Sequence, residues 1–162
     1  MRGFGITIAG ASVAALAVMS VSPLQAQLAE RKILTLAQAK KLMAAAEAEA
    51  VRNRFVMCIA VVDEAGNLLA FERMDEAELA CIHLAEEKAR TAVLFKRPTK
   101  QLDDQISGAR SAAVAMGFTP VEGGVPLTSN GKVVGAIGAS GGTSAQDQQV
   151  ATAAAEIMRE AR

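Results

Sequence analysis

The glycine-rich segment Gly138-Ala139-Ser140-Gly141-Gly142 is the part of the sequence that comes nearest to a catalytic motif. It fits the pattern G-x-S-x-G, in which a tight turn presents a serine nucleophile. That chemistry needs a general base, and in hydrolases of this kind the histidine follows the serine. The single histidine, His83, precedes it. We therefore predict no serine catalysis, and the sequence offers no other catalytic set.

The same small residues predict a site for an anion. They separate an expected strand from a helix expected to begin at Ser144-Ala145-Gln146-Asp147. Such a turn leaves backbone N–H groups exposed and convergent, and the helix N-terminus adds partial positive charge. A glycine-rich turn that only reverses the chain is the alternative. No G-K-[ST] follows, so the segment does not predict binding of a nucleoside triphosphate.

A group of basic side chains lies around the end of the second expected long helix. Its members are Lys88, Arg90, Lys96, Arg97 and Lys100. The plain interpretation is favourable interaction with the carbonyl groups at a helix end. The sharper one is a clamp for an anionic ligand, such as the propionates of haem or an organic acid.

His83 is a candidate ligand for a metal or for haem iron. Its helical neighbours Glu86 and Glu87 place it near a polar face, so a solvated surface histidine is the alternative. Cys81 and His83 are two residues apart on a helix and point in different directions. No further ligands at zinc spacing accompany them, and we expect no metal site built from protein side chains alone.

Composition narrows the class of protein. The chain has 162 residues, 51% of them apolar, with 17 basic and 17 acidic side chains and 3% aromatics. This length and apolar content predict one domain with a hydrophobic core. A neutral, aromatic-poor chain lacks the basic surface and stacking groups that nucleic acids require, so we expect no nucleic-acid partner.

The first residues read as a secretory signal. Arg2 precedes a mostly apolar run over residues 6–21, then Pro23 interrupts it and Leu24-Gln25-Ala26 offers a cleavage site. We expect residues 1–26 to be removed and the protein to be periplasmic or secreted; an uncleaved anchor is the alternative. Cys58 and Cys81 would then meet an oxidising compartment, where they either pair or remain buried thiols.

Periodicity predicts the elements of the first half. Thr35 and Gln38 form a capping box for a helix that continues to about Arg54. Residues 55–62 and 68–74 read as the two strands of a hairpin. A second helix fits residues 77–95.

The second half repeats this alternation of helix and hairpin. Thr99 is placed to cap a third helix to about Met116, and strands are expected at 125–128 and 132–139 around the turn Asn130-Gly131. The last helix begins at Ser144-Ala145-Gln146-Asp147 and continues to the C-terminus. The whole order predicts an α+β domain, an antiparallel sheet with flanking helices.

Several segments together resemble the GlcG/HbpS family, which also occurs as the C-terminal domain of PduO-type proteins. They are Leu34-Thr35-Leu36, Ile59-Ala60-Val61-Val62-Asp63, Phe71-Glu72-Arg73-Met74-Asp75, Lys88-Ala89-Arg90-Thr91-Ala92, Arg97-Pro98-Thr99, Val121-Glu122-Gly123-Gly124-Val125-Pro126-Leu127, Val134-Gly135-Ala136-Ile137-Gly138 and Ser144-Ala145-Gln146-Asp147. The resemblance implies a profilin-like domain over residues 33–162, a homo-oligomer and haem binding, in some members with secretion and a role in redox sensing or haem handling. The haem-ligating histidine that some relatives carry in the first helix has no counterpart here, since residues 39–54 contain none.

Three functional hypotheses follow. The leading one is an exported, non-catalytic haem-binding protein. The second is an accessory protein or enzyme for a small carboxylic acid, acting at the Gly138–Asp147 segment, and the third is a scaffold for a partner protein. The residues assigned to ligand binding are Lys88, Arg90, Arg97, Thr99, Gly123, Gly124, Ser140, Gly141 and Asp147, with His83 as the iron ligand.

Overall fold

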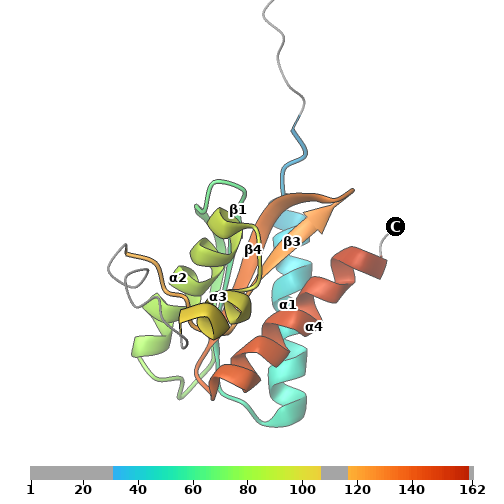
Figure 1. Ribbon diagram of the computed structural model, residues 1–162. Coiled ribbons are helices and arrows are strands. Elements are labelled where there is room, and N and C mark those ends of the chain that lie inside the picture. The colour runs from blue at the N-terminus through green and yellow to red at the C-terminus, as the bar shows by residue number, and fades with distance from the viewer. Residues whose placement is uncertain (1–30, 107–116, 161–162) are drawn as a thin grey trace, which may run out of the picture. The chain divides into compact units, whose positions relative to one another are not determined.

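The centre of the molecule is one antiparallel sheet with the strand order β2-β1-β4-β3 (Figure 1). Its strands are β1 (Cys58–Asp63), β2 (Leu68–Arg73), β3 (Gly124–Ser129) and β4 (Lys132–Ser140). The computed structural model describes residues 31–106 and 117–160. The sequence-based expectation of an α+β fold is confirmed.

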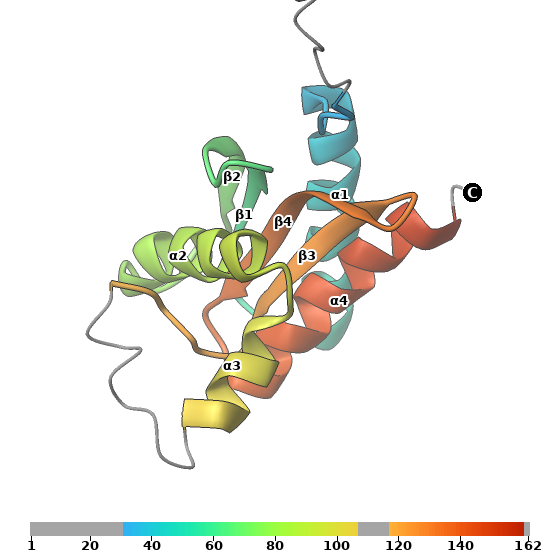
Figure 2. The ribbon, with the colours of Figure 1, turned by 45° about the horizontal axis from the view of Figure 1, so that its top comes forward.

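Helices cover both faces of this sheet (Figure 2). They are α1 (Leu36–Asn53), α2 (Ala80–Phe95), α3 (Thr99–Ile106) and α4 (Ser144–Glu160). Side chains alternate along β1, so Ile59 and Val61 face α1 and α4, whereas Cys58 and Ala60 face α2. The result is three layers, with α1 and α4 on one side and α2 on the other.

The two faces are packed differently. The α1 and α4 side holds the large core, which includes Leu42, Met57 and Ile137, all fully buried. The α2 side holds two small clusters made mostly of alanine, valine and cysteine. There α2 lies very close to β4, because a Cβ added at Gly138 would overlap the backbone of Ala85. Only glycine permits this approach.

A disulfide between Cys58 and Cys81 joins β1 to the first turn of α2. Their Cα atoms are 5.5 Å apart, within the range that a disulfide spans. The sequence left pairing and inert thiols as alternatives, and the structure has the pair. The bond matters locally because Leu79, the residue before α2, makes no side-chain hydrogen bond to cap the helix.

Local hydrogen bonds and φ angles set the start of α1, the β3–β4 turn and the start of α4. The Thr35 hydroxyl accepts the Gln38 N–H at 3.2 Å and caps α1, which confirms half of the predicted capping box. The other half is not seen, and the side-chain amide of Gln38 instead lies 3.3 Å from Met158 Sδ of α4. Asn130 and Gly131 both have positive φ in the β3–β4 turn, which agrees with the expected tight hairpin. The predicted cap of α4 was one residue late: Thr143 is the cap, and its N–H is bonded to Gln146 Oε1 at 2.8 Å.

Three predicted boundaries need correction. The strand expected from residue 55 begins at Cys58, because Arg54 is left-handed (φ 60°) and the Phe55 N–H still bonds the Ala50 carbonyl oxygen of α1. The helix expected from residue 77 begins at Ala80. Thr99 lies within α3, and its hydroxyl binds Gly124 instead of capping the helix. The expected continuation of this helix over residues 107–116 lies outside the described residues, as does the leader expected at 1–26.

Candidate functional site

Lys88 and Asp147 form a buried ion pair at the centre of the predicted ligand site. Lys88 extends from α2 and Asp147 from the first turn of α4, and Lys88 Nζ lies 2.6 Å from Asp147 Oδ2. Their side chains are only 3% and 4% exposed. Lys88 Nζ also lies 3.4 Å from the carbonyl oxygen of Ala139 in β4. The pair therefore links helices on opposite faces of the sheet.

The second oxygen of Asp147 closes the glycine-rich turn. Oδ1 accepts the N–H of Gly142 at 3.0 Å. Burial raises the pKa of the Asp147 carboxyl, while the Lys88 ammonium and the N–H groups of Gly142 and Gly141 oppose that rise. The sequence predicted that backbone N–H groups of this turn bind an external anion. In the structure the Asp147 carboxylate accepts the Gly142 N–H instead.

Two glycines and Thr99 complete the wall around this pair. A Cβ at Gly124 would overlap the Lys88 carbonyl oxygen, and one at Gly123 (φ 126°) would press on Asp147 and Lys88. The Gly124 N–H donates to Thr99 Oγ1 at 2.8 Å. These three residues act here through close packing and hydrogen bonds within the protein.

Ser140 and Gly141 lie at the end of the same turn. Ser140 is the last residue of β4 and is buried. Gly141 has φ 139°, and a Cβ there would overlap the Val56 carbonyl oxygen. The structure therefore brings seven of the nine predicted ligand residues to one place: Lys88, Thr99, Gly123, Gly124, Ser140, Gly141 and Asp147.

Arg90 and Arg97 do not join that centre. Arg90 Nη2 lies 3.3 Å from Glu86 Oε1 on the same helix. The Arg97 guanidinium lies 5.7 Å from the centre of the Phe95 ring, a cation–π contact. The predicted basic cluster is thus divided, with Lys88 buried and the arginines held by local partners.

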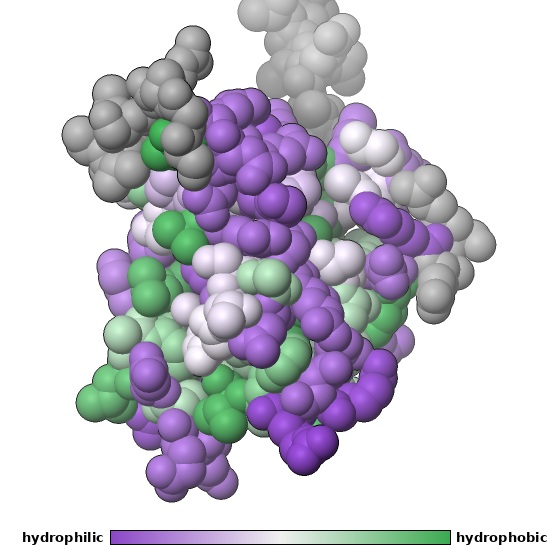
Figure 3. Space-filling view, turned by 60° about the horizontal axis from the view of Figure 1, so that its bottom comes forward, coloured by the Kyte–Doolittle hydropathy of each residue, from purple (hydrophilic) through white to green (hydrophobic). Residues whose placement is uncertain are grey.

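His83 lies on the outer surface of α2 in a partly apolar patch. Leu79, Ile82 and Leu84 are also exposed, and we call these three residues with His83 the His83 patch. Figure 3 shows apolar side chains grouped among polar ones on the side where α2 lies. Within residues 31–106 and 117–160, no three His, Cys, Asp or Glu side chains gather at metal-binding distance.

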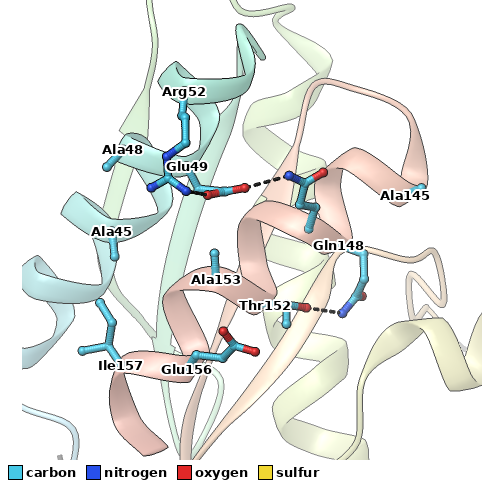
Figure 4. A pocket seen from close by; sticks show the side chains of 11 residues that line it. Ala45, Ala48, Glu49, Arg52, Ala145, Gln148, Thr152, Ala153, Glu156 and Ile157 are labelled. Carbon is cyan, nitrogen blue, oxygen red and sulfur yellow. Dashed lines mark hydrogen bonds and ion pairs between the residues drawn. The ribbon is translucent and has the colours of Figure 1, made fainter. Parts of the chain in front are cut away.

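An open groove of about 780 Å³ lies between α1 and α4 (Figure 4). Its lining combines small apolar residues with polar ones, namely Ala45, Ala48, Glu49, Arg52, Ala145, Gln148, Gln149, Thr152, Ala153, Glu156 and Ile157. We call it the α1/α4 groove. This groove was not predicted from the sequence. The alanines on both helices were the available signal, since small side chains leave space where two helices meet.

Glu49 organises the polar wall of the α1/α4 groove. Its carboxylate, in a residue only 8% exposed, accepts bonds from Arg52 at 2.6 Å, Asn53 at 2.8 Å and Gln149 at 2.7 Å. The Arg52 side chain is 71% exposed, and guanidinium has five N–H donors, so most of them remain free for an anionic group. This cation is accessible, whereas Lys88 is not.

A smaller groove of about 400 Å³ lies between α1 and β2. It is lined by Leu36, Lys40, Met43, Ala44, Glu47, Leu69, Ala70, Phe71 and Glu72, and we call it the α1/β2 groove. Burial raises the pKa of the Glu72 carboxyl, and the nearby negative charge of Glu47 adds a smaller rise.

In the described part of the chain, no helix is long and apolar enough to cross a bilayer.

Comparison with known proteins defines the class. The family model described as haem degrading protein HbpS-like matches residues 34–156. The chain therefore belongs to the HbpS-like family, which confirms the resemblance seen in the sequence.

Individual relatives agree with this assignment. Protein GlcG of Escherichia coli (strain K12) is 43% identical over 109 residues, which cover 67% of this chain and 81% of that protein. The crystal structure of a double mutant of Streptomyces reticuli HbpS matches with a TM-score of 0.76 at 33% identity, over 92% of this chain and 97% of that one. The crystal structure of the PduOC:heme complex matches with a TM-score of 0.71 at 28% identity, over 77% and 94%.

Proposed function

We propose that this protein binds haem. The observation that carries the proposal is the match over most of the domain to a solved relative in complex with heme, within a family described by haem degradation. The chain's own composition agrees, because an apolar porphyrin needs exposed apolar side chains and its iron needs an imidazole or a sulfur ligand. The described surface offers both.

The His83 patch is the proposed place for the iron. Its imidazole is exposed, and Leu79, one turn earlier, is 74% exposed, the highest value among the exposed large apolar side chains of the described residues. Haem supplies four ligands from its porphyrin, so one histidine suffices to hold it. Arg90, two turns after His83, offers a guanidinium with donors beyond those that face Glu86 and Glu87.

The geometry does not favour the second hypothesis, a small carboxylic acid bound at the Gly138–Asp147 segment. The Asp147 carboxylate already accepts the Gly142 N–H and pairs with Lys88. An incoming acid would have to displace a buried charge and leave it unpaired, which costs several kcal/mol. If the protein binds such acids, Arg52 in the α1/α4 groove is the accessible cation.

Export is also part of the proposal. The basic, apolar and small-residue order of residues 1–26 supports export to the periplasm or beyond. A buried disulfide between Cys58 and Cys81 is consistent with an oxidising compartment. Together with haem binding, these features support a role in haem handling or redox sensing.

Titration of the purified protein with hemin tests this function. We expect a shifted Soret band that saturates at one haem per chain, and His83→Ala should weaken binding and change the band. Arg52→Met, in the α1/α4 groove away from α2, is the control and should bind as the wild type does. A titration that matches a non-binding control protein would reject haem binding. Loss of the Soret band over time with a reductant and oxygen would show degradation instead of simple binding.

A further inference from the structure

The α1/α4 groove carries opposite charges at its two ends (Figure 4). At one end lies the Arg52 guanidinium, whose side chain is 71% exposed. At the other end lies Glu156, an exposed residue whose carboxylate pairs with no basic side chain in residues 31–106 and 117–160. A ligand that contacts both ends therefore needs a negative group and a positive group.

Glu49, beside Arg52, leaves the guanidinium available to a second anion. Its carboxylate is satisfied within the protein, because Arg52, Asn53 and Gln149 all donate hydrogen bonds to it. Arg52 uses only Nη1 in this contact, at 2.6 Å, so most of its five N–H donors remain. The ion pair thus holds the guanidinium at the rim of the groove, and an incoming carboxylate can accept bonds from the other donors.

The two ends of the groove lie about two helical turns apart. Arg52 and Gln149 both contact Glu49, so these two residues mark the same level of the groove. From there to Glu156, α4 advances seven residues, which at 1.5 Å per residue is about 10 Å. An extended peptide spans at most about 3.3–3.6 Å per residue, so roughly three residues separate two charges by this distance. The charges of a single amino acid lie too close together.

The side chains between the two ends suit a peptide group. The Thr152 hydroxyl oxygen accepts a hydrogen bond from Gln148 at 2.9 Å, so its proton remains to be donated. The Gln149 amide donates to Glu49, and its Oε1 accepts no bond within the described residues. One donor and one acceptor are what a peptide unit pairs with. The alanines of both helices leave space for a backbone between them.

We propose that the α1/α4 groove binds a short peptide of about three residues with free termini, in an extended conformation. The C-terminal carboxylate of the peptide contacts Arg52, and its N-terminal ammonium group contacts Glu156. A peptide group between them bonds to Thr152 and Gln149. This site goes beyond haem binding and does not depend on it, because the His83 patch lies on α2, across the sheet.

Isothermal titration calorimetry of the purified protein with trialanine tests the site. We expect saturable binding. N-acetyl-trialanine and trialanine amide each lack one terminal charge and should bind roughly threefold to fivefold more weakly, the range for an ion pair open to water. Free alanine should bind no better than the blocked peptides. Absence of saturable heat with trialanine, or equal affinity for trialanine and both blocked peptides, would overturn the proposal.

Variants at the two ends assign each terminus of the peptide. Arg52→Met should bind trialanine and trialanine amide equally, while it still prefers trialanine to the acetylated form. Glu156→Gln should show the reverse pattern. Glu47→Gln, a residue of α1 that lines the α1/β2 groove, is the matched control and should bind all three peptides as the wild type does. Circular dichroism would verify that the variants remain folded.

The pattern of losses decides the outcome. An Arg52→Met protein that still distinguishes trialanine from its amide would overturn the proposal, as would equal losses in Glu47→Gln and Glu156→Gln. Hemin titration of Arg52→Met separates this site from the haem site, because the variant should lose the preference for a free carboxylate and keep its response to hemin. Failure of hemin binding in the wild type would leave the peptide results to stand alone.

Discussion

The two faces of the sheet hold their helices by different means. On one face, α1 and α4 share a large core and leave an open groove whose carboxylate, Glu49, is surrounded by neutral amides and an exposed arginine. On the other, α2 has only small alanine-rich clusters beneath it. There a disulfide, a buried ion pair and a glycine contact fix the helix.

This difference between the two faces indicates where a ligand site is expected. Polar groups that compensate for a small core must be satisfied within the protein, because an unpaired buried charge is costly. They are therefore poor candidates for ligand binding even when their residue types are right. Exposed groups beside apolar surface, such as His83 on α2 and Arg52 in the α1/α4 groove, retain the capacity to bind.

Removal of Lys88 should cause the largest loss in the free energy of unfolding. Lys88→Met leaves Asp147 buried without its cation, and we expect a loss of about 3–5 kcal/mol in the free energy of unfolding. Urea denaturation measures it. Lys100→Met removes an exposed pair with Asp104 and is the control, expected to leave the midpoint unchanged. Equal midpoints for wild type and Lys88→Met would contradict the structural role of the pair.

Removal of the disulfide should come next in size. The double variant Cys58→Ala, Cys81→Ala is expected to lose about 2–4 kcal/mol, because the unfolded chain gains freedom and the uncapped start of α2 loses its anchor. Thermal unfolding with and without a thiol reductant measures this. The reductant should lower the wild-type midpoint and leave that of the variant unchanged. A wild-type midpoint insensitive to complete reduction would contradict the anchor.

The pH dependence of Asp147 sharpens the account of the buried pair. Burial raises the pKa of the Asp147 carboxyl in the folded state, whereas the pKa of an aspartate in the unfolded chain is about 3.9. Between the unfolded-state pKa and the higher folded-state pKa, the folded state binds more protons than the unfolded state. The free energy of unfolding of the wild type, relative to Asp147→Asn, should therefore fall as pH rises between these two pKa values. Above the folded-state pKa it should remain constant. Urea unfolding at a series of pH values tests this. A relative gain in stability with rising pH would mean that Lys88 outweighs burial.

Loss of Arg52 should have the smallest effect. Arg52→Met removes a mostly exposed cation from Glu49, which keeps the hydrogen bonds from Asn53 and Gln149. We expect a loss of at most about 1 kcal/mol in the free energy of unfolding. A loss as large as that of Lys88→Met, measured in the same urea experiment, would contradict the claim that the buried Lys88–Asp147 pair contributes more to stability than the exposed Arg52–Glu49 pair.

The sequence predicts the parts of this structure that depend on neighbours in the chain. Thr35 with Gln38, and Asn130 with Gly131, determine their helix start and turn by local hydrogen bonds and φ angles. The start predicted for the first strand, residue 55, was wrong because the apolar pattern does not show that Arg54 ends α1 with a left-handed residue. Local rules describe the elements better than their ends.

The candidate site depends on contacts that local rules do not reach. Lys88 and Asp147 are 59 positions apart, and Glu49 and Gln149 are 100 apart. The sequence correctly grouped the glycine-rich turn with Lys88. It could not show that the Asp147 carboxylate would accept the Gly142 N–H that the prediction assigned to an external anion. Burial, which separates a packing residue from a binding residue, emerges only when both faces of the sheet are assembled.

The absorption spectrum of the protein, purified from cells that export it and make haem, tests the central claim most directly. We expect a Soret band in the wild type, retained in Arg52→Met and lost or shifted in His83→Ala. A colourless, folded wild-type protein that also fails to change the spectrum of added hemin would contradict haem binding.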